Sequence, residues 1–433
     1  MNSILIQNGR IIDPASGRDE IGDLLIVDGK IADASKSNGS PGQVIDARGK
    51  IVAPGFIDCH VSFGEPGYDE DETIATGAAA ALAGGFTTVA CLPGTNPVID
   101  TRALAEFIIR QGERARQCRV LPLGAVTKGL EGLELAEIGQ LVDGGAVAFT
   151  DGKKAVANAE IMRRALQYTG MWNKPVLHHA QVPELVQGGI MHEGFQSTVI
   201  GLLGMPAAAE EIMVRRDLAL AETTGGQIHL MCVSSLRSVD EIRRAQQRGL
   251  RVTADVTPHH LLLTDECIAG YDANYKVNPP VRTEEHRAAL IEGLKDGTIS
   301  IIASDHQPVA NEKKHLEIDR SPFGIIGLET LLPLCVEALI VPGHLTWADL
   351  ISKLTVGPAT LLELPTGHLA VGAAADVVIL DPEARWTIDL NEFQSRSRNS
   401  PFHGRSAQGR VVTTIVEGEV RYQLPAAAAV SSV

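Results

Sequence analysis

Short hydrophobic runs alternate with amphipathic stretches through the middle of the chain, from about residue 51 to residue 365. The runs are rich in Val, Ile, Leu and Ala, as buried parallel strands require, and the stretches between them have helical periodicity. This alternation indicates parallel strand–helix units. The candidate strands are residues 55–59, 87–92, 119–123, 146–150, 175–178, 228–231, 251–256 and 300–304. Eight strands close a (β/α)8 TIM barrel, so we predict an α/β fold of that type.

A doubly wound open sheet is the alternative architecture for the same alternation. That fold binds dinucleotides through a Gly-x-Gly-x-x-Gly turn after an early strand. No such motif follows the early candidate strands in this sequence. The barrel is therefore the favoured prediction for residues 51–365.

The two ends of the chain share a different pattern, in which short apolar strands are broken by turns. Asp28-Gly29 between two apolar runs is a hairpin signal. The candidate strands at the ends are residues 4–7, 10–12, 23–27, 30–32, 43–46, 376–381 and 410–422. We predict that residues 1–50 and 366–422 form one small β-sandwich domain beside the barrel. The Ala-rich tail, residues 423–433, is expected to be disordered.

Composition narrows the class of protein. The 433 residues carry a formal net charge of −15, which argues against nucleic acid or an anionic membrane as a partner. Six cysteines are scattered without a Cys-x-x-Cys pair, so neither a disulfide framework nor a structural zinc knuckle is indicated. The N-terminus lacks the pattern of a signal peptide, and no apolar run is long enough to span a membrane. We expect a cytoplasmic protein.

Polar residues stand at the ends of several predicted barrel strands. They are His60, Asp151, His179, Cys232 and Asp305. Because the carboxyl ends of barrel strands line the active site, these side chains are expected to converge at one mouth. A structural role is the simpler interpretation of each residue alone, but their joint placement favours a functional site.

Motifs along the chain identify a known family. Residues 54–67 read Pro-Gly-Phe-Ile-Asp-Cys-His-Val-Ser-Phe-Gly-Glu-Pro-Gly. Further blocks are residues 85–89, 252–266, 278–282, 302–306, 323–330 and 397–404. In this order they resemble the type I dihydroorotases of the amidohydrolase superfamily over nearly the whole chain. Hydantoinases and allantoinases share the barrel, but Asn-Pro-Pro-Val-Arg followed by Asp-His favours the dihydroorotase side.

The resemblance implies a reaction and a set of site residues. Dihydroorotases interconvert carbamoyl aspartate and dihydroorotate, using a metal-bound hydroxide and an Asp that carries the proton. The family's metal positions correspond here to His60, Asp151, His179, Cys232 and Asp305. Asp305 also matches the catalytic Asp, and Asn278 matches a substrate-binding residue.

Several family positions are substituted. Ser62 replaces the second His of the first strand, and Cys232 replaces the His of the sixth. Gly64 replaces the Arg that holds the substrate carboxylate, and Gly94 replaces a substrate-binding Asn. Val309 replaces the second His of the Asp-His-x-Pro-His block. Asp305 and Asn278 are then vestigial, and no cofactor is expected beyond at most one zinc at the remnant site.

Three functions are compatible with this depleted set. We favour a catalytically inactive dihydroorotase-like protein of pyrimidine biosynthesis. The resemblance implies that such chains are structural partners of aspartate carbamoyltransferase, in a hetero-dodecamer of six transferase and six dihydroorotase-like chains. The chain is then not an enzyme.

The second function is a cyclic amide hydrolase with a remodelled mononuclear zinc site. It needs a new anion-binding residue, for which Lys153, Lys154 and Arg282 are candidates, although both lysines are expected on a solvated loop. The third is a still-active dihydroorotase in which His178 or His229 supplies a missing ligand. His178 would point away from His179 if both lie in a strand.

Overall fold

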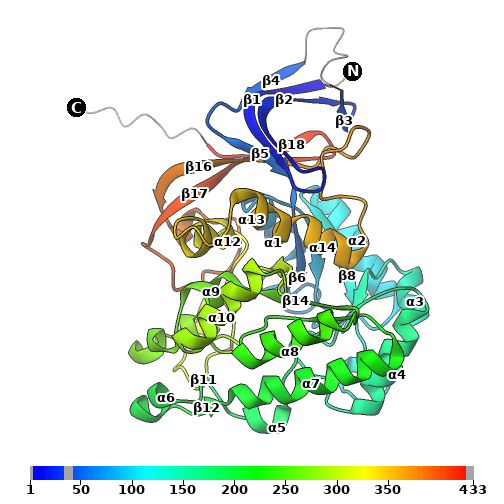
Figure 1. Cartoon of the computed structure of the whole chain (residues 1–433), viewed down its shortest axis with the longest axis vertical. Coiled ribbons are helices and arrows are strands. Elements are labelled where there is room, and N and C mark those ends of the chain that lie inside the picture. Colours follow the sequence, from blue (N-terminus) through cyan, green and yellow to red (C-terminus); the bar gives the residue numbers. More distant parts are fainter. Residues whose placement is uncertain (1–2, 34–41, 426–433) are drawn as a thin grey trace.

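A parallel barrel and a terminal β-sheet make up the molecule (Figure 1). The computed structural model describes residues 3–33 and 42–425. Most of the tail that we expect to be disordered, residues 426–433, lies outside the described residues. Among the described helices, none is both long and apolar enough to cross a bilayer.

Eight parallel strands form the barrel in sequence order, apart from a short two-stranded insertion, which confirms the predicted TIM-barrel fold. The barrel strands are β6 (Phe56–Val61), β7 (Phe86–Cys91), β8 (Arg119–Gly124), β9 (Ala148–Phe149), β10 (Val176–His178), β13 (Ile228–Leu230), β14 (Val252–Val256) and β15 (Ile301–Ile302). The insertion pairs β11 (Met191–His192) with β12 (Gly204–Met205). Each barrel strand overlaps one of the eight hydrophobic runs, because these residues are buried on both faces.

The seam between the first and last barrel strands is closed by individual hydrogen bonds. The backbone N–H of Ser62 donates to the carbonyl of His306 over 2.9 Å. The buried carboxylate of Asp58 accepts from the backbone N–H of Ser304 at 3.0 Å and of His60 at 3.2 Å. These contacts hold the end of β6, with His60, beside the segment that carries Asp305.

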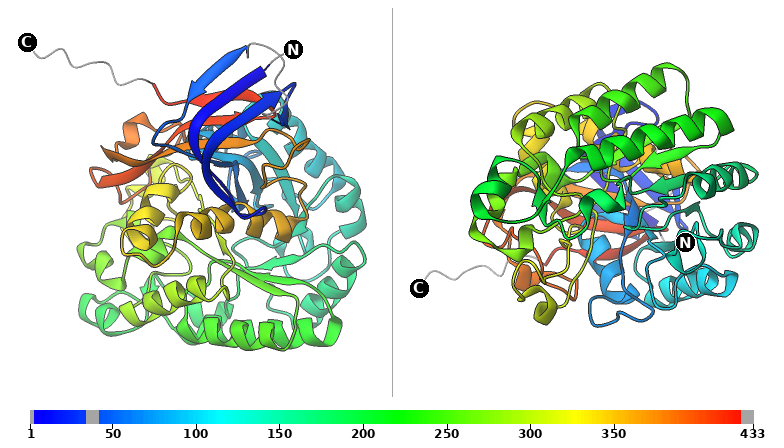
Figure 2. Two further views of the ribbon diagram at one scale, coloured as in Figure 1. Left: turned by 45° about the horizontal axis from the view of Figure 1, so that its top comes forward. Right: turned by 90° about the horizontal axis from the view of Figure 1, so that it is seen from below.

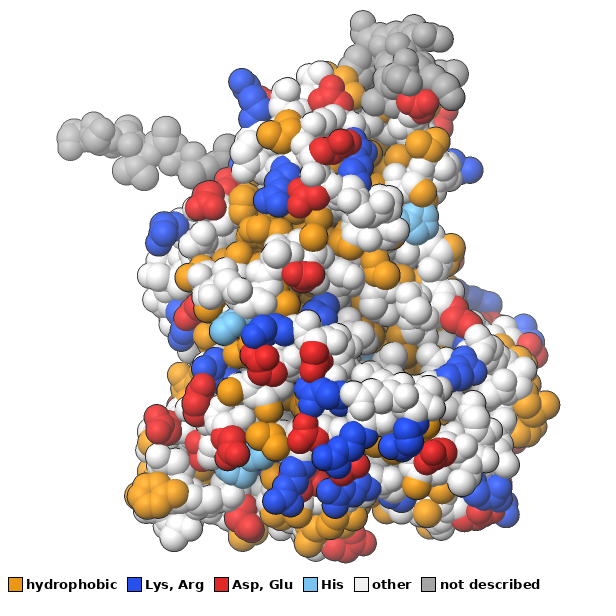
Figure 3. All heavy atoms as spheres, viewed as in Figure 1, with side chains coloured by type: hydrophobic (Ala, Val, Ile, Leu, Met, Phe, Trp, Pro, Cys, Tyr) orange, Lys and Arg blue, Asp and Glu red, His pale blue; other side chains and the backbone are white. Residues whose placement is uncertain are grey.

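Helices cover the outside of the barrel (Figure 2). The longer ones are α1 (Ile74–Ala83), α2 (Arg102–Ala115), α3 (Ile138–Asp143), α4 (Ala159–Gly170), α7 (Ala207–Thr224), α8 (Leu236–Gln247), α10 (Glu284–Lys295), α13 (Trp347–Leu354) and α14 (Val356–Leu362). Shorter ones are α5 (Pro183–Val186), α6 (Phe195–Ile200), α9 (Pro258–Leu262), α11 (Asn311–Lys314), α12 (Leu331–Cys335), η2 (Lys128–Leu130), η3 (Asp265–Gly270), η4 (Ala273–Tyr275), η5 (Val336–Ile340) and η6 (Leu390–Glu392). Acidic and basic side chains are interspersed over α7 and α8 on the face shown in Figure 3.

Strands from both ends of the chain join in one sheet. Its members are β1 (Ser3–Asp13), β2 (Arg18–Val27), β3 (Lys30–Ala32), β4 (Gln43–Asp46), β5 (Ile51–Pro54), β16 (Val377–Thr387), β17 (Ser406–Val416) and β18 (Glu419–Gln423). Their order is β18-β17-β16-β5-β1-β2-β3, with β4 beside β1. The strands form one continuous hydrogen-bonded path, and they make up a second, β-rich part of the molecule built from both chain ends. The predicted Asp28-Gly29 hairpin is present, since Val27 pairs with Lys30.

Two details of this sheet differ from the sequence pattern. The candidate strands at residues 4–7 and 10–12 are a single strand, β1, whose register shifts between Ile6 and Gly9. Strand β5 belongs to the terminal sheet although it lies within residues 51–365, the range predicted for the barrel. The exact division of the chain into domains stays a prediction.

Two carboxylates, half-buried Glu329 and buried Glu72, fasten residues 394–396 to the barrel. Glu329 accepts from the backbone N–H groups of Gln394 and Ser395 at 3.0–3.1 Å. Glu72 accepts from the Ser395 hydroxyl and the backbone N–H of Arg396. Burial raises the pKa of Glu329 from 4.5 to about 7, and the neighbouring charge of Glu72 acts in the same direction. Glu329 therefore keeps its proton in the folded protein over a range in which the unfolded chain loses it.

This raised pKa predicts a contribution to stability that is present below pH 4.5 and lost as the pH rises through about 7. Glu329→Gln removes the titration, so the difference in melting temperature between the variant and the wild type should shift in the variant's favour from pH 5 to pH 8. The measurement is thermal unfolding followed by circular dichroism across that range. Glu113→Gln, at an exposed position on α2, is the control and should leave the pH profile unchanged. An identical profile for wild type and Glu329→Gln would contradict the prediction.

Candidate functional site

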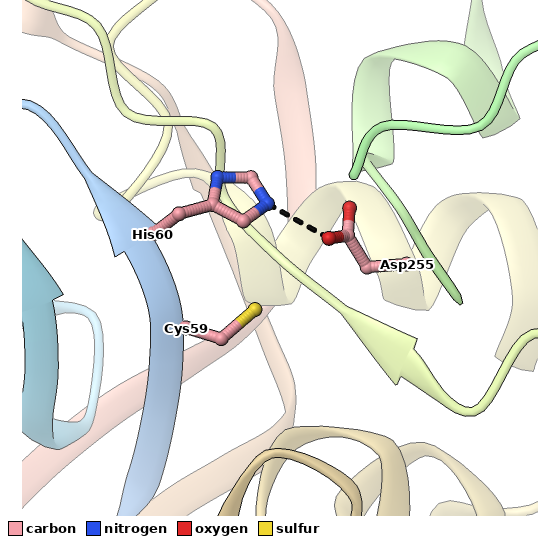
Figure 4. Close-up of side chains that lie close together, drawn as sticks. All are labelled: Cys59, His60 and Asp255. Carbon is pink, nitrogen blue, oxygen red and sulfur yellow. Dashed lines mark hydrogen bonds and ion pairs between the residues drawn. The ribbon is translucent and has the colours of Figure 1, made fainter. Parts of the chain in front are cut away.

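Asp255, at the carboxyl end of β14, is the centre of a buried hydrogen-bond network at the barrel mouth. Its Oδ2 lies 2.8 Å from His60 Nε2 on β6 and 2.8 Å from His229 Nε2 on β13. Its Oδ1 accepts from the backbone N–H of Cys232 at 2.9 Å. Figure 4 shows the His60 ring turned towards Asp255, with Cys59 beside them. One carboxylate therefore ties together three barrel strands and two candidate site residues.

The opposite charges of Asp255 and the two histidines determine which of these groups carry a proton. Burial alone would raise the pKa of Asp255, but His60 and His229 bring it well below its ordinary value. Burial likewise opposes protonation of His60, yet the adjacent Asp255 carries the pKa of that ring well above its ordinary value. Both shifts favour the charged forms, a protonated His60 ring beside an ionised Asp255. Sequence reasoning missed Asp255, although its inward position near the end of a predicted strand was a usable signal.

Three of the predicted site residues come together beside this network. One ligand atom from each of His60, Cys232 and Asp305 lies within 4.8 Å of the other two. Cys59, His60 and Asp255 form a second group of this kind, and in the described part of the chain neither group includes Asp151 or His179. The side chains of both groups are buried and could offer nitrogen, sulfur and oxygen ligands to a metal.

A lysine lies among these groups. Lys153 Nζ is 2.6 Å from Asp305 Oδ1, 3.1 Å from the carbonyl of Asn278 and 3.7 Å from Cys232 Sγ. Only 20% of its side chain is exposed. The expectation of a solvated loop is therefore wrong for Lys153 and right for Lys154, which is exposed.

The residues present do not fit zinc in this arrangement. Zinc binds carboxylate, imidazole and thiolate at about 2.0–2.3 Å, and it needs deprotonated ligands. Here the Lys153 ammonium contacts Asp305 and Cys232, and Nε2 of His60 is engaged with Asp255. Burial raises the pKa of the Cys232 thiol to about 11, and Asp305 adds to that rise. His60, Cys232 and Asp305 thus lie in a cluster whose charges are balanced by Lys153 and Asp255.

Asp151 and His179 are buried at the same end of the barrel but differ in their contacts. The Asp151 carboxylate accepts from the backbone N–H groups of Val126 and Thr127, each at 2.9 Å, and from the Thr127 hydroxyl. Within residues 3–33 and 42–425, neither ring nitrogen of His179 has a hydrogen-bond partner, and burial holds the pKa of that ring well below its ordinary value. His179 and Cys232 line a small recess of about 10 Å³, which has room for about one water molecule. His179 is therefore a neutral imidazole buried without a polar partner.

The substituted positions show how the backbone has adapted. Gly64 has a left-handed backbone, with φ of 69°, and a Cβ there would lie 2.6 Å from the carbonyl oxygen of Tyr68 and 3.0 Å from that of Glu72. Gly94 is exposed, and a Cβ there would meet nothing within 4 Å. Val309 is buried, with its backbone N–H donating to Asn399 Oδ1. Position 94 can therefore accept a side chain, whereas position 64 cannot without moving the backbone.

The residues that the sequence offered as replacements for a lost ligand or for the lost arginine already have other partners. His178 accepts from the backbone N–H of Val156 at Nε2 and donates from Nδ1 to the Asp217 carboxylate, so it faces away from the mouth. His229 is bound to Asp255. Arg282 donates to Ser234 Oγ at 2.8 Å and lies 3.6 Å from Glu210. None of these three replaces a lost ligand or the lost arginine.

The parallel barrel, the polar residues at its carboxyl-terminal strand ends and the added β-sheet define the amidohydrolase class. The structure superposes on L-hydantoinase (dihydropyrimidinase) from Arthrobacter aurescens with a TM-score of 0.87 and 27% identity, over 97% of this chain and 96% of that one. D-hydantoinase (dihydropyrimidinase) from Thermus sp. gives 0.80 and 25%, over 96% and 94%.

Sequence comparison narrows the class to one family. A model described as dihydro-orotase-like matches residues 49–238, and one for the amidohydrolase family matches residues 244–422. A dihydroorotase of Pelotomaculum thermopropionicum is 49% identical over 97% of this chain and 98% of its own length. A dihydroorotase of Solibacter usitatus is 47% identical over the same shares. The chain belongs to the dihydroorotase family, which confirms the resemblance seen in the motifs.

The Asp255 network predicts a large stability effect. Asp255→Asn leaves the buried His60 cation without its counter-charge, so the free energy of unfolding should fall by about 3–5 kcal/mol. Denaturant unfolding followed by circular dichroism measures it. The control is Asp19→Asn, which breaks an exposed ion pair with Arg10 and should cost less than about 1 kcal/mol. Equal decreases in the free energy of unfolding for the two variants would show that Asp255 stabilises the protein no more than an exposed ion pair does.

The glycine geometry predicts a contrast between two substituted family positions. Gly64→Ala combines a left-handed backbone with two close carbonyl oxygens and should cost about 2 kcal/mol or more. Gly94→Ala meets open space and should change stability by about 0.5 kcal/mol or less. The same unfolding measurement compares the pair. A tolerated Gly64→Ala would mean that the loop can readily accept a side chain.

Proposed function

We propose that this chain is a dihydroorotase-family protein of pyrimidine biosynthesis that does not turn over dihydroorotate. Its role is that of a structural partner of aspartate carbamoyltransferase in the cytoplasm. The observation that carries the catalytic part of the proposal is the backbone at Gly64.

The family places at this position an arginine that holds the substrate carboxylate. Such a charge-assisted contact contributes roughly 1.5–3 kcal/mol. In this chain the loop is built around a left-handed glycine whose missing Cβ leaves room for the carbonyl oxygens of Tyr68 and Glu72. The loss of the arginine is thus accompanied by a loop shape that excludes its return. Arg282, a candidate replacement, is buried against Glu210 and Ser234.

The partner role is supported by the combination of an intact fold and a depleted site. The chain matches a dihydroorotase along 97% of its length, so it has the whole family fold. The resemblance to non-catalytic dihydroorotase-like chains implies a complex with the transferase, the preceding enzyme of the pathway, as a hetero-dodecamer of six chains of each kind. A rigid barrel that binds the native transferase stabilises it by mass action.

A cyclic amide hydrolase acting on another substrate is the second candidate. The observation that favours it is His179 at the barrel mouth, a buried imidazole whose two ring nitrogens have no partner among the described residues. The structural similarity to an L-hydantoinase, at 27% identity, is consistent with a ring amide as the substrate. This function requires turnover of a cyclic amide other than dihydroorotate.

We expect the purified chain to interconvert carbamoyl aspartate and dihydroorotate no faster than a buffer blank, with or without added zinc. The reason is that neither the substrate carboxylate nor a metal has its family ligands. The measurement is dihydroorotate absorbance in both directions, with an active dihydroorotase as positive control. Hydantoin and dihydrouracil, assayed in parallel, test the second candidate. Turnover of dihydroorotate that disappears in Asp305→Ala would contradict the proposal.

We also expect the chain to co-elute with the aspartate carbamoyltransferase of its own cell when the two are co-expressed. The transferase should have a higher melting temperature in the complex than alone, because the partner binds only its native state. Size-exclusion chromatography with light scattering gives the stoichiometry, and a folded barrel of another amidohydrolase serves as the control partner. Separate elution, together with a transferase that is fully active and stable alone, would sink this part of the proposal.

A further inference from the structure

We propose that Lys153 is a built-in cation that takes the place of the family's metal and masks a latent zinc site made of His60, Cys232 and Asp305. This inference concerns the same pocket and rests on the proposed function, because a non-catalytic barrel has no need of a metal-bound hydroxide.

The contacts of Lys153 match the capacity of an ammonium group. Its three N–H bonds face three acceptors, which are Asp305 Oδ1 at 2.6 Å, the Asn278 carbonyl at 3.1 Å and Cys232 Sγ at 3.7 Å. Asp305 is 5% exposed, so its charge needs a partner inside the protein. Lys153 supplies that partner without any ion from solution.

The local backbone explains how a lysine reaches the pocket. Asp151, two residues earlier, is held outwards from the cluster by the amides of Val126 and Thr127. The N–H of Gly152 donates to Thr150 Oγ1 at 2.9 Å, and Gly152 has a left-handed φ of 63°. This turn brings the next side chain, Lys153, back over the strand ends. The carboxylate that bridges metals in the family and the incoming lysine are therefore positioned by one tight turn.

A zinc ion and the ammonium cannot share this pocket. Zinc bound to Asp305 and Cys232 would use two of the three acceptors of Lys153, at distances of about 2.0–2.3 Å. The two cations would also repel each other where little water screens them. Without the ammonium, His60 Nδ1, which has no hydrogen-bond partner in the described part of the chain, faces Asp305 Oδ1 at 3.8 Å. One nitrogen, one sulfur and one oxygen with an open fourth position make a recognised zinc donor set.

The test is zinc binding to the full chain and its Lys153 variants. Wild type, Lys153→Ala and Lys154→Ala are incubated with zinc, desalted and analysed for metal by mass spectrometry. Lys154→Ala removes an exposed lysine from the adjacent position and is the matched control. We expect about one zinc per chain in Lys153→Ala and only trace zinc in the other two. Lys153→Gln, which keeps most of the side chain but not its charge, serves if Lys153→Ala does not fold.

Cobalt identifies the ligands. Co²⁺ added to Lys153→Ala should give the near-ultraviolet thiolate charge-transfer band, and Lys153→Ala with Cys232→Ser should lose it. Zinc should also raise the melting temperature of Lys153→Ala but not that of the wild type.

Two results would overturn the inference, and they are separable from failure of the proposed function. Stoichiometric zinc in the wild type would show that Lys153 masks nothing, whether or not dihydroorotate is turned over. A folded Lys153→Ala or Lys153→Gln that binds no zinc would remove the latent site, while an inactive wild type would leave the non-catalytic role standing.

Discussion

The carboxylate of Asp255 is the contact on which the barrel mouth depends. It is fully buried, and it joins β14 to His60 on β6, to His229 on β13 and to the backbone N–H of Cys232. A buried carboxylate is tolerated only where charge and hydrogen bonds compensate its lost hydration. Because Asp255 engages Nε2 of His60, that nitrogen helps to hold the strands together and only Nδ1 of the ring is left for a metal.

The barrel fold was predictable because the pattern of apolar runs that indicates it is local and is repeated along the sequence. Eight apolar runs separated by helical stretches predict a barrel whichever residues form its mouth, and each observed strand overlaps its run. The terminal sheet was predictable in its strands but not in their connection. The bulge that keeps β1 continuous past Asn8, and the pairing of β5 with both β1 and β16, depend on neighbours far away in the sequence.

The site was predictable only as a set of positions at strand ends. His60, Cys232 and Asp305 do converge, as residues at the carboxyl ends of barrel strands must. Asp151 lies at the same end but is turned to backbone amides, which no spacing rule indicates. The sequence marked Lys153 as a loop residue because a lysine after a strand is usually solvated. Its burial follows from the turn at Gly152 and from acceptors contributed by two distant segments.

The two halves of the depleted site were lost by different physical means. On the substrate side, the backbone at Gly64 now occupies the space in which an arginine would begin. On the metal side, His60, Cys232 and Asp305 still converge, but the charge of Asp305 is balanced by Lys153. One substitution rarely restores a changed backbone shape, whereas one substitution is enough to remove an ammonium group. Under the proposal for Lys153, one substitution is enough to free the three ligands at the metal position. A carboxylate-binding side chain at position 64 would instead require a rebuilt loop.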